Sequence, residues 1–144
     1  MTTTIAIGSD HAGFDLKEAI KKKLNTQGVI VIDFGTNSSE PADYPDFAHP
    51  VANAVEKGAA PLGVLVCGSG NGVCMTANKH ANIRAALCWN EELASLARSH
   101  NNANVLCLPS RYISTEKALS ILDSFLNATF EGGRHERRVG KIAC

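Results

Sequence analysis

The 144-residue sequence predicts an α/β fold: a three-layer, doubly wound sheet of five parallel strands with helices on both faces, of the Rossmann-like kind. Short, wholly apolar runs alternate along the chain with longer amphipathic stretches, which is typical of buried strands joined by helices. The alternation repeats five times. Five units are too few for a closed barrel of eight strands, and they suit an open sheet with right-handed crossovers.

The first strand–helix unit shows the pattern clearly. Residues 5–8 form a short apolar run, and residues 14–24 then place apolar side chains on one helical face and lysines on the other. Gly28 is a natural stop for this helix, and residues 29–32 form the second apolar run. The sequence therefore predicts two strands with a helix between them.

A long irregular segment separates this unit from the rest. Residues 33–46 carry glycine, asparagine, serine and proline, and a segment of this length inside a compact domain is usually functional. Helices are predicted at residues 47–56, 71–79, 90–100 and 114–126, and strands at residues 62–67, 83–87 and 104–108. Asn90 is the expected N-cap of one helix, and Ser114 or Thr115 that of the last.

Composition narrows the classes of protein that the chain can be. Lys plus Arg and Asp plus Glu number 14 each, so no overall charge attracts nucleic acid or a membrane. The first residues lack a signal-peptide pattern, and no apolar run reaches membrane-spanning length. The cysteines are five, an odd number, and none is spaced as a zinc ligand pair: Cys67, Cys74, Cys88, Cys107 and Cys144. We expect a cytoplasmic protein with reduced thiols and no metal.

The central feature is the stretch from Leu62 to Gly72, in which a buried strand ends in a glycine-dense turn before a helix. Cys67 lies at the strand's end. Backbone N–H groups of the turn can converge on an anion and stabilise a thiolate, which makes Cys67 the best candidate for a nucleophile or general base. Most free cysteines are simply small buried hydrophobic residues, and that interpretation stands beside the functional one.

Other candidates follow the strands of the predicted sheet, where ligands of such folds bind. Asp10 and His11 follow the first strand, and Ser69 follows the third. His100 ends a helix at the opposite edge, so it can serve this site only from a neighbouring subunit or through an unusual turn. The chain has no G-x-G-x-x-G after its first strand and no P-loop, and it lacks the aspartate of a phospho-acceptor domain at Cys67.

The C-terminal stretch after the helix predicted at residues 114–126 is the second indication of a functional site. A double glycine, Gly132 and Gly133, precedes a cluster of cations. Arg134 and Arg138 are four residues apart, so on a helix they share one face and can clamp a phosphate. The sequence therefore divides into a single α/β domain over residues 1–130 and a basic extension over residues 131–144 that completes a phosphate site. A solvated basic tail is the plainer alternative.

Seven co-linear motifs together resemble ribose-5-phosphate isomerase type B, in the family that also holds galactose-6-phosphate isomerase. The motifs are G-S-D-H-A-G-F at residues 8–14, D-Y-P at 43–45, V-C-G-S-G-N-G at 66–72, A-N-K at 77–79, I-R-A at 83–85, H-N-N-A-N-V at 100–105 and G-G-R-H at 132–135. The resemblance implies a doubly wound homodimer, or a dimer of dimers, with shared active sites. It also implies that no metal or organic cofactor takes part, and that the substrate is a phosphorylated sugar.

The resemblance also implies a role for each matching residue. Cys67 would move the proton between C2 and C1, while Ser69 and the loop N–H groups stabilise the enediolate. Asp10 and His100 would help to open the sugar ring. Substrate contacts would come from three groups of residues: the loop residues Gly68, Gly70, Asn71 and Gly72; Asn101 and Tyr44, which hold hydroxyl groups; and His11, Arg111, Arg134 and Arg138, which bind the phosphate.

Two departures from the family pattern bear on these roles. One branch uses a glutamate further along the loop as the base, but residues 73–76 here offer no carboxylate, which favours Cys67. Ser69 stands where threonine is common and keeps the hydroxyl. Six-carbon substrates such as allose or galactose 6-phosphate are alternatives to ribose 5-phosphate. A non-catalytic phosphosugar-binding module is the alternative from another class.

Overall fold

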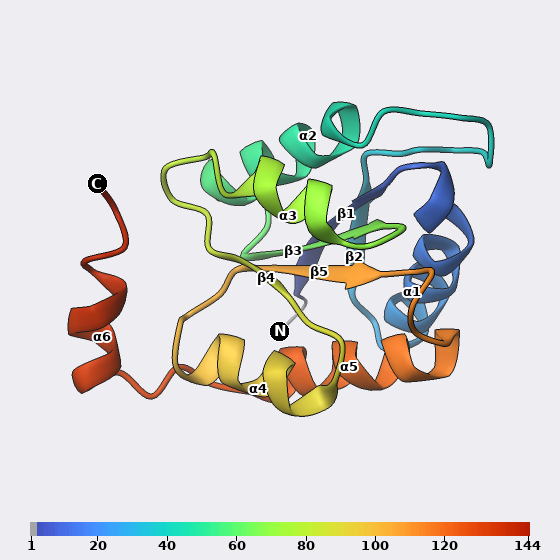
Figure 1. Cartoon of the computed structure of the whole chain (residues 1–144). Coiled ribbons are helices and arrows are strands. Elements are labelled where there is room, and N and C mark those ends of the chain that lie inside the picture. The colour runs from blue at the N-terminus through green and yellow to red at the C-terminus, as the bar shows by residue number, and fades with distance from the viewer. Residues whose placement is uncertain (1–2) are drawn as a thin grey trace.

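A computed structural model describes residues 3–144, and its architecture is the predicted one (Figure 1). Five parallel strands form one sheet in the order β2-β1-β3-β5-β4. The strands are β1 (Thr4–Ser9), β2 (Ile30–Asp33), β3 (Leu62–Cys67), β4 (Ala85–Leu87) and β5 (Val105–Pro109). The helices are η1 (His11–Gly13), α1 (Phe14–Thr26), α2 (Pro45–Glu56), α3 (Asn71–Ala77), α4 (Glu91–Ser99), α5 (Thr115–Asn127) and α6 (Arg134–Val139).

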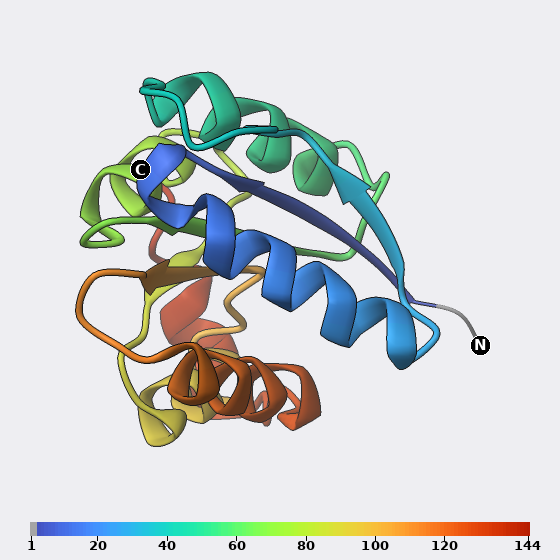
Figure 2. The same cartoon turned by 90° about the vertical axis from the view of Figure 1, so that its right-hand side faces the viewer.

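Helices cover both faces of the sheet, as Figures 1 and 2 show. Helices α2 and α3 pack on one face, and α1, α4 and α5 pack on the other. Side chains of β3 alternate between the two cores: Val64 and Val66 face α1 and α5, whereas Leu65 and Cys67 face α2 and α3. Because both faces are buried, the strand is apolar throughout, and this is the pattern that predicts it from sequence.

Element boundaries differ from the predicted ones where side chains take over backbone hydrogen bonds. The predicted strand over residues 83–87 is wrong at its start, since Arg84 N–H donates to the Asn104 side chain (2.8 Å) and β4 begins at Ala85. The helix predicted over residues 71–79 ends at Ala77, because the Asn78 side chain pairs with the backbone of Ala85 (2.8 and 3.0 Å). Helix α2 begins two residues early, with Pro45 in its first turn.

The order of the strands reverses direction at β1, and this reversal marks the expected ligand position at the carboxyl edge of the sheet. The chain leaves β1 toward β2 on one side, while β3 lies on the other side of β1. This reversal is the position at which open α/β sheets bind ligands.

Among the described residues, no helix is long and apolar enough to cross a membrane.

The close approach of η1 to β3 depends on Gly13. A Cβ at this position would lie 2.6 Å from the carbonyl oxygen of Val66, which is backbone and cannot swing aside. We expect Gly13→Ala to lower the free energy of unfolding by about 1–3 kcal/mol, because overpacking of this kind forces backbone shifts. Urea unfolding measures the change. Gly140→Ala is the control, since its Cβ would meet nothing nearer than 3.4 Å, and an equal loss in both variants would contradict the steric explanation.

A buried ion pair joins α1 to the end of β2. The Lys17 side chain is fully buried, and its Nζ lies 2.7 Å from Asp33 Oδ2. Lys21 Nζ lies 2.7 Å from the same oxygen. Burial acts to raise the pKa of Asp33, but hydrogen bonds from Lys17 and Lys21 outweigh it and hold that pKa below the ordinary value of 3.8. The pair therefore stabilises the fold above that pH and loses its contribution as the pH falls through the lower native pKa.

We expect Asp33→Asn to lower the free energy of unfolding by about 1.5–3 kcal/mol near pH 7, because the buried Lys17 ammonium then keeps only the half-exposed Glu18 carboxylate, 2.8 Å away, as its counter-ion. The difference from wild type should shrink below about pH 4, as Asp33 itself becomes protonated. Urea titrations over a pH series measure this. Asp123→Asn is the control, since Asp123 pairs with Lys23 at 2.8 Å on the surface. A loss at pH 7 that persists undiminished in acid would contradict the ion-pair account.

Candidate active site

Cys67 ends β3 at the carboxyl edge of the sheet, and loops from three strands meet around it. Its carbonyl oxygen accepts from the backbone N–H of Ser110 (2.9 Å) and from Ser110 Oγ (3.1 Å). Ser110 Oγ also lies 2.8 Å from the carbonyl oxygen of Ala12. Ser110 therefore links the loops after β1, β3 and β5. The sequence patterns gave no sign of this serine, because its partners are distant along the chain.

The thiol of Cys67 is enclosed. The residue is 5% exposed and belongs to the core between the sheet and α2 and α3. Two other cysteines are poorly suited to act as thiolates: burial raises the pKa of Cys88 to about 12, and burial raises the pKa of Cys107 as well.

Close neighbours leave little room for a side chain at the glycines that follow Cys67. A Cβ on Gly68 would lie 3.1 Å from Arg111 Nη1, and a Cβ on Gly72 would lie 2.5 Å from the Tyr44 ring. Gly70 has φ of 75°, and a Cβ there would clash with the Leu87 side chain and lie 3.2 Å from the backbone of Leu108. The loop is thus pressed between two predicted substrate-binding side chains, Arg111 and Tyr44.

Ser69 and Asn71 meet within this loop. The backbone N–H of Asn71 donates to Ser69 Oγ (3.3 Å), at the first residue of α3. The hydroxyl of Ser69 remains able to donate its own proton to a bound oxygen. The loop thus offers a hydroxyl donor beside Cys67.

Asp10 and His11 lie on the neighbouring loop, after β1. Asp10 is 7% exposed, its Oδ1 accepts from Gly13 N–H (3.1 Å), and its own N–H donates to Val66 O (3.3 Å). These bonds place its carboxylate beside the end of β3. His11 Nδ1 accepts from Ala42 N–H (3.1 Å), and Ala42 O lies 3.2 Å from the same nitrogen. The 3.1 Å contact fits a neutral ring protonated on Nε2 and the 3.2 Å contact one protonated on Nδ1, so either tautomer holds the ring against the backbone of Ala42.

Arg111 completes the group at this edge. Its backbone N–H donates to Gly68 O (3.0 Å), and its guanidinium covers Gly68. Within residues 3–144, no carboxylate lies within 4.0 Å of this guanidinium. An uncompensated guanidinium beside a glycine loop suits an anionic ligand.

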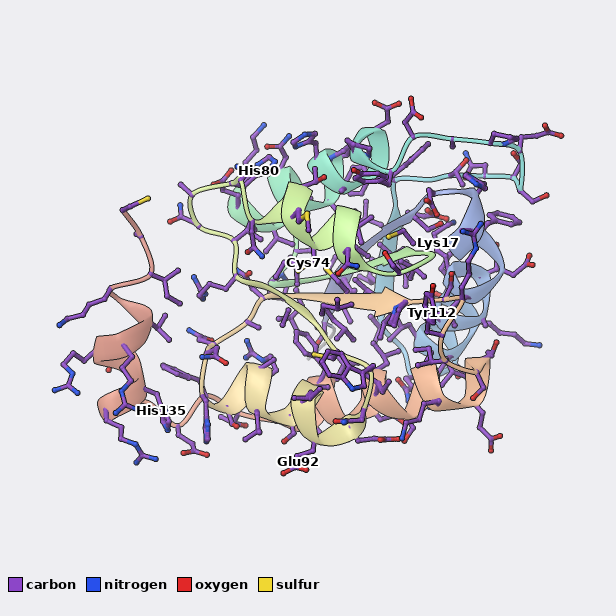
Figure 3. The ribbon with its side chains drawn as sticks, viewed as in Figure 1. Lys17, Cys74, His80, Glu92, Tyr112 and His135 are labelled. Atoms are coloured by element: carbon purple, nitrogen blue, oxygen red, sulfur yellow. The ribbon has the colours of Figure 1, made fainter. Side chains whose placement is uncertain are left out.

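The remaining predicted residues lie at the opposite edge of the sheet. His100 and Asn101 follow α4, and Arg134 and Arg138 lie on α6, which stands at the other end of the molecule from the carboxyl edge (Figure 1). His135 of α6 and Tyr112 of the carboxyl edge lie at opposite ends in Figure 3. The structure confirms that His100 is at the far edge. It also places Arg134 and Arg138 on one helix.

A cavity of about 460 Å³ separates α6 from α4 and the edge strand β4. His100, Asn101 and Arg138 line it together with His135, and its other walls are apolar side chains such as Leu87 and Leu96. The His100 and His135 rings stack, with centroids 4.1 Å apart and 13° between planes. Sequence patterns had assigned no role to His135. Its proximity to His100 arises only because the chain returns to the end of α4, where Glu131 N–H donates to Ser99 O (3.0 Å).

One chain therefore carries two separate groups of predicted residues. The carboxyl edge holds Cys67, Ser69, Asp10, His11, Tyr44 and Arg111, whereas the amino edge holds His100, Asn101, Arg134 and Arg138. The first group holds the thiol, and the second holds most of the cations. Neither group alone has all the chemistry that the sequence pattern predicts.

Comparisons with known proteins identify the family. The ribose/galactose isomerase family model matches residues 5–142. The chain is 49% identical to ribose-5-phosphate isomerase B of Escherichia coli over 97% of this chain and 94% of that protein. It is 50% identical to a probable ribose-5-phosphate isomerase B of Mycoplasma genitalium over 99% of this chain and 95% of that protein.

Solved structures are similarly close. A ribose 5-phosphate isomerase of Thermotoga maritima superposes with a TM-score of 0.96 at 51% identity, covering 98% of this chain and 97% of that chain. The Mycoplasma genitalium enzyme with bound ribulose-5-phosphate superposes with a TM-score of 0.94 at 50% identity, covering 97% of this chain and 93% of that chain. The resemblance carried by the seven motifs is confirmed. The chain belongs to the ribose/galactose isomerase family.

Proposed function

We propose that this chain is an aldose–ketose isomerase that interconverts ribose 5-phosphate and ribulose 5-phosphate with Cys67 as its general base. The observation that carries the proposal is the position of Cys67, enclosed at the carboxyl edge of the sheet beneath the glycine loop and beside Arg111. Relatives at about half identity bear the name ribose-5-phosphate isomerase B, which supports the choice of substrate.

The proposed reaction moves two protons and no net electrons. The Cys67 thiolate removes the proton from C2 of the open-chain aldose, and the C2–H electron pair forms the enediolate double bond as the carbonyl pair moves onto the C1 oxygen. The thiol then returns its proton to C1, and the proton of the C2 hydroxyl passes to the C1 oxygen, which gives the ketose. Ser69 Oγ and the N–H groups of Gly68 to Gly72 stabilise the enediolate oxygens, which carry charge only as the reaction proceeds.

Ring opening precedes this step. Asp10 and His100 exchange protons with the ring oxygen and the anomeric hydroxyl, and Asn101 and Tyr44 hold hydroxyl groups of the open chain. His11 and Arg111 bind the phosphate from the carboxyl edge, and Arg134 and Arg138 bind it from α6. Asn71 and the loop glycines shape the floor on which the substrate lies.

The proposed site is shared between two copies of the chain. Because the two groups of residues lie at opposite edges, His100, Asn101, Arg134 and Arg138 of one copy complete the Cys67 site of the other. The cavity between α6 and α4 supports this arrangement, since His100, Asn101 and Arg138 line it beside apolar side chains. Residues 131–144 thus serve as the extension that completes the phosphate site in a homodimer or a dimer of dimers. A cytoplasmic location stays a prediction from the cysteine pattern.

A coupled assay with ribose 5-phosphate tests the proposed function. We expect saturable turnover that does not fall after treatment with a chelator, because neither metal nor organic cofactor takes part. Allose 6-phosphate and galactose 6-phosphate are the comparison substrates, and faster turnover of either would replace the five-carbon assignment. Phosphosugar binding without turnover of any of the three would support a binding module and contradict the enzyme.

Alkylation tests whether an enclosed thiol is essential. Cys144 is exposed and would react first, so the experiment uses Cys144→Ser as the starting protein. We expect iodoacetamide to abolish activity slowly, since Cys67 is 5% exposed, and bound ribose 5-phosphate to protect it. Mass spectrometry of the modified peptide reads out the site. Full activity after stoichiometric labelling of Cys67 would contradict the assignment of the base.

A further inference from the structure

His100, Glu131 and His135 form a cluster of metal-ligating side chains at the amino edge of the sheet. They come from the end of α4, the linker before α6, and α6 itself, and their ligand atoms all lie within 4.8 Å of one another. His100 Nε2 lies 3.6 Å from Glu131 Oε2, and His135 Nε2 lies 3.6 Å from Glu131 Oε1. No sequence motif indicates these three residues as a set, because His100 is distant along the chain from Glu131 and His135.

A second observation points to a ligand at the cluster. His135 is 6% exposed, and its Nε2 is a buried nitrogen without a hydrogen-bond partner among the described residues. Buried polar atoms of native proteins are nearly always satisfied, so such a nitrogen calls for a partner.

The donor set is that of zinc. Two imidazoles and one carboxylate bind Zn²⁺ at about 2.0–2.2 Å and leave one position for water, and tetrahedral ligands at that distance are about 3.3 Å apart. The two observed 3.6 Å contacts run to different oxygens of Glu131, and the ligand atoms lie within 4.8 Å of one another, so the side chains must close in slightly around an ion. The rings are 13° from parallel, so the half-exposed His100 must tilt for both nitrogens to face one ion. Arg134 and Arg138 oppose a cation here, and the Glu131 carboxylate offsets one of their two charges.

We propose that His100, Glu131 and His135 bind one divalent transition-metal ion of the zinc class, and that the bound ion withholds His100 from the sugar. Imidazole donors favour Zn²⁺, Co²⁺ or Ni²⁺ over Mg²⁺ and Ca²⁺, which prefer oxygen ligands. The metal acts as an inhibitor and takes no part in the reaction. The inhibitory half rests on the proposed function, whereas the binding half does not.

Titration of the metal-free full-length protein with CoCl₂ and ZnCl₂ tests the binding half. We expect one Co²⁺ per chain, visible light absorption of a nitrogen–oxygen site, and displacement by Zn²⁺ but not by Mg²⁺. Glu131→Gln and His135→Gln should each weaken binding at least about tenfold. His80→Gln is the control, because His80 belongs to a separate pair in which its Nε2 lies 2.8 Å from His49 Nδ1.

Three results would overturn the binding half. One is the absence of saturable Co²⁺ binding. Another is loss of binding in His80→Gln but not in Glu131→Gln. The third is a thiolate-to-cobalt charge-transfer band, which would place the ion on a cysteine instead.

Isomerase assays test the inhibitory half. We expect Zn²⁺ to inhibit the wild-type protein and a chelator to restore turnover. Glu131→Gln, whose side chain has no role in the proposed reaction, should keep basal turnover and need at least about tenfold more Zn²⁺ for inhibition. Equal inhibition of both proteins would contradict the proposal. Cobalt binding in a protein without isomerase activity would instead refute the proposed function and leave the metal site intact.

Discussion

Replacement of Cys67 by alanine is expected to lower kcat by about 10²–10⁴-fold, the usual contribution of a positioned general base. The thiol acts at C1 and C2 in the transition state, whereas the affinity for substrate depends on cations elsewhere. Binding of ribose 5-phosphate, measured by calorimetry, should therefore change little. Cys67→Ser should lose nearly as much activity, because an unactivated hydroxyl is a far weaker base than a thiolate.

Cys74→Ser is the matched control for this loss. Cys74 lies half-buried on α3, where its Sγ lies 3.4 Å from the carbonyl oxygen of Ala85, and it has no role in the proposed reaction. We expect that variant to keep most of its turnover. Near-normal kcat in Cys67→Ala, or an equal loss in Cys74→Ser, would remove Cys67 from the mechanism.

Replacement of Arg138 by alanine is expected to raise KM about 10–150-fold, which corresponds to a charge-assisted hydrogen bond of roughly 1.5–3 kcal/mol. The guanidinium contacts the phosphate in both the ground state and the transition state, so its loss should affect KM more than kcat. Folding should be unaffected, since Arg138 is exposed on a short terminal helix.

Arg137→Ala separates this specific contact from the general charge of α6. Arg137 lies on the same helix, but Arg138 lines the cavity with His100 and Arg137 does not. We expect Arg137→Ala to change KM by less than about threefold, because the Arg137 guanidinium is an exposed charge at some distance from the proposed phosphate position. Equal KM increases in the two variants would mean that α6 attracts the substrate only through its net charge.

The fold followed from sequence because burial on both faces leaves a visible apolar signature in β3 and β5. That pattern does not predict the order of the strands across the sheet. Periodicity identifies strands but says nothing of which strand lies next to which, so the insertion of β5 between β3 and β4 is evident only in three dimensions.

The sequence pattern also does not identify residues whose partners are distant along the chain. Lys17 stands in a helix rich in lysine and resembles its exposed neighbours, yet it is buried because Asp33 ends a strand beside it. Ser110 and His135 gain their neighbours only when loops far apart in the chain meet. By contrast, Cys67 was identifiable since a strand, a thiol and three glycines follow one another directly. The position of His100 at the end of a helix had already indicated either a second subunit or an unusual turn.

The shared site is tested most directly by mixing Cys67→Ala and Arg138→Ala chains, refolded together so that mixed dimers form and assayed below the wild-type KM. If Arg138 serves the partner's Cys67, each mixed dimer has one intact site. Random pairing should then restore about a quarter of wild-type activity. A chain with both substitutions, mixed with wild type, should give mixed dimers with no intact site. Activity in the first mixture no higher than the average of its two variants would contradict a site shared between chains.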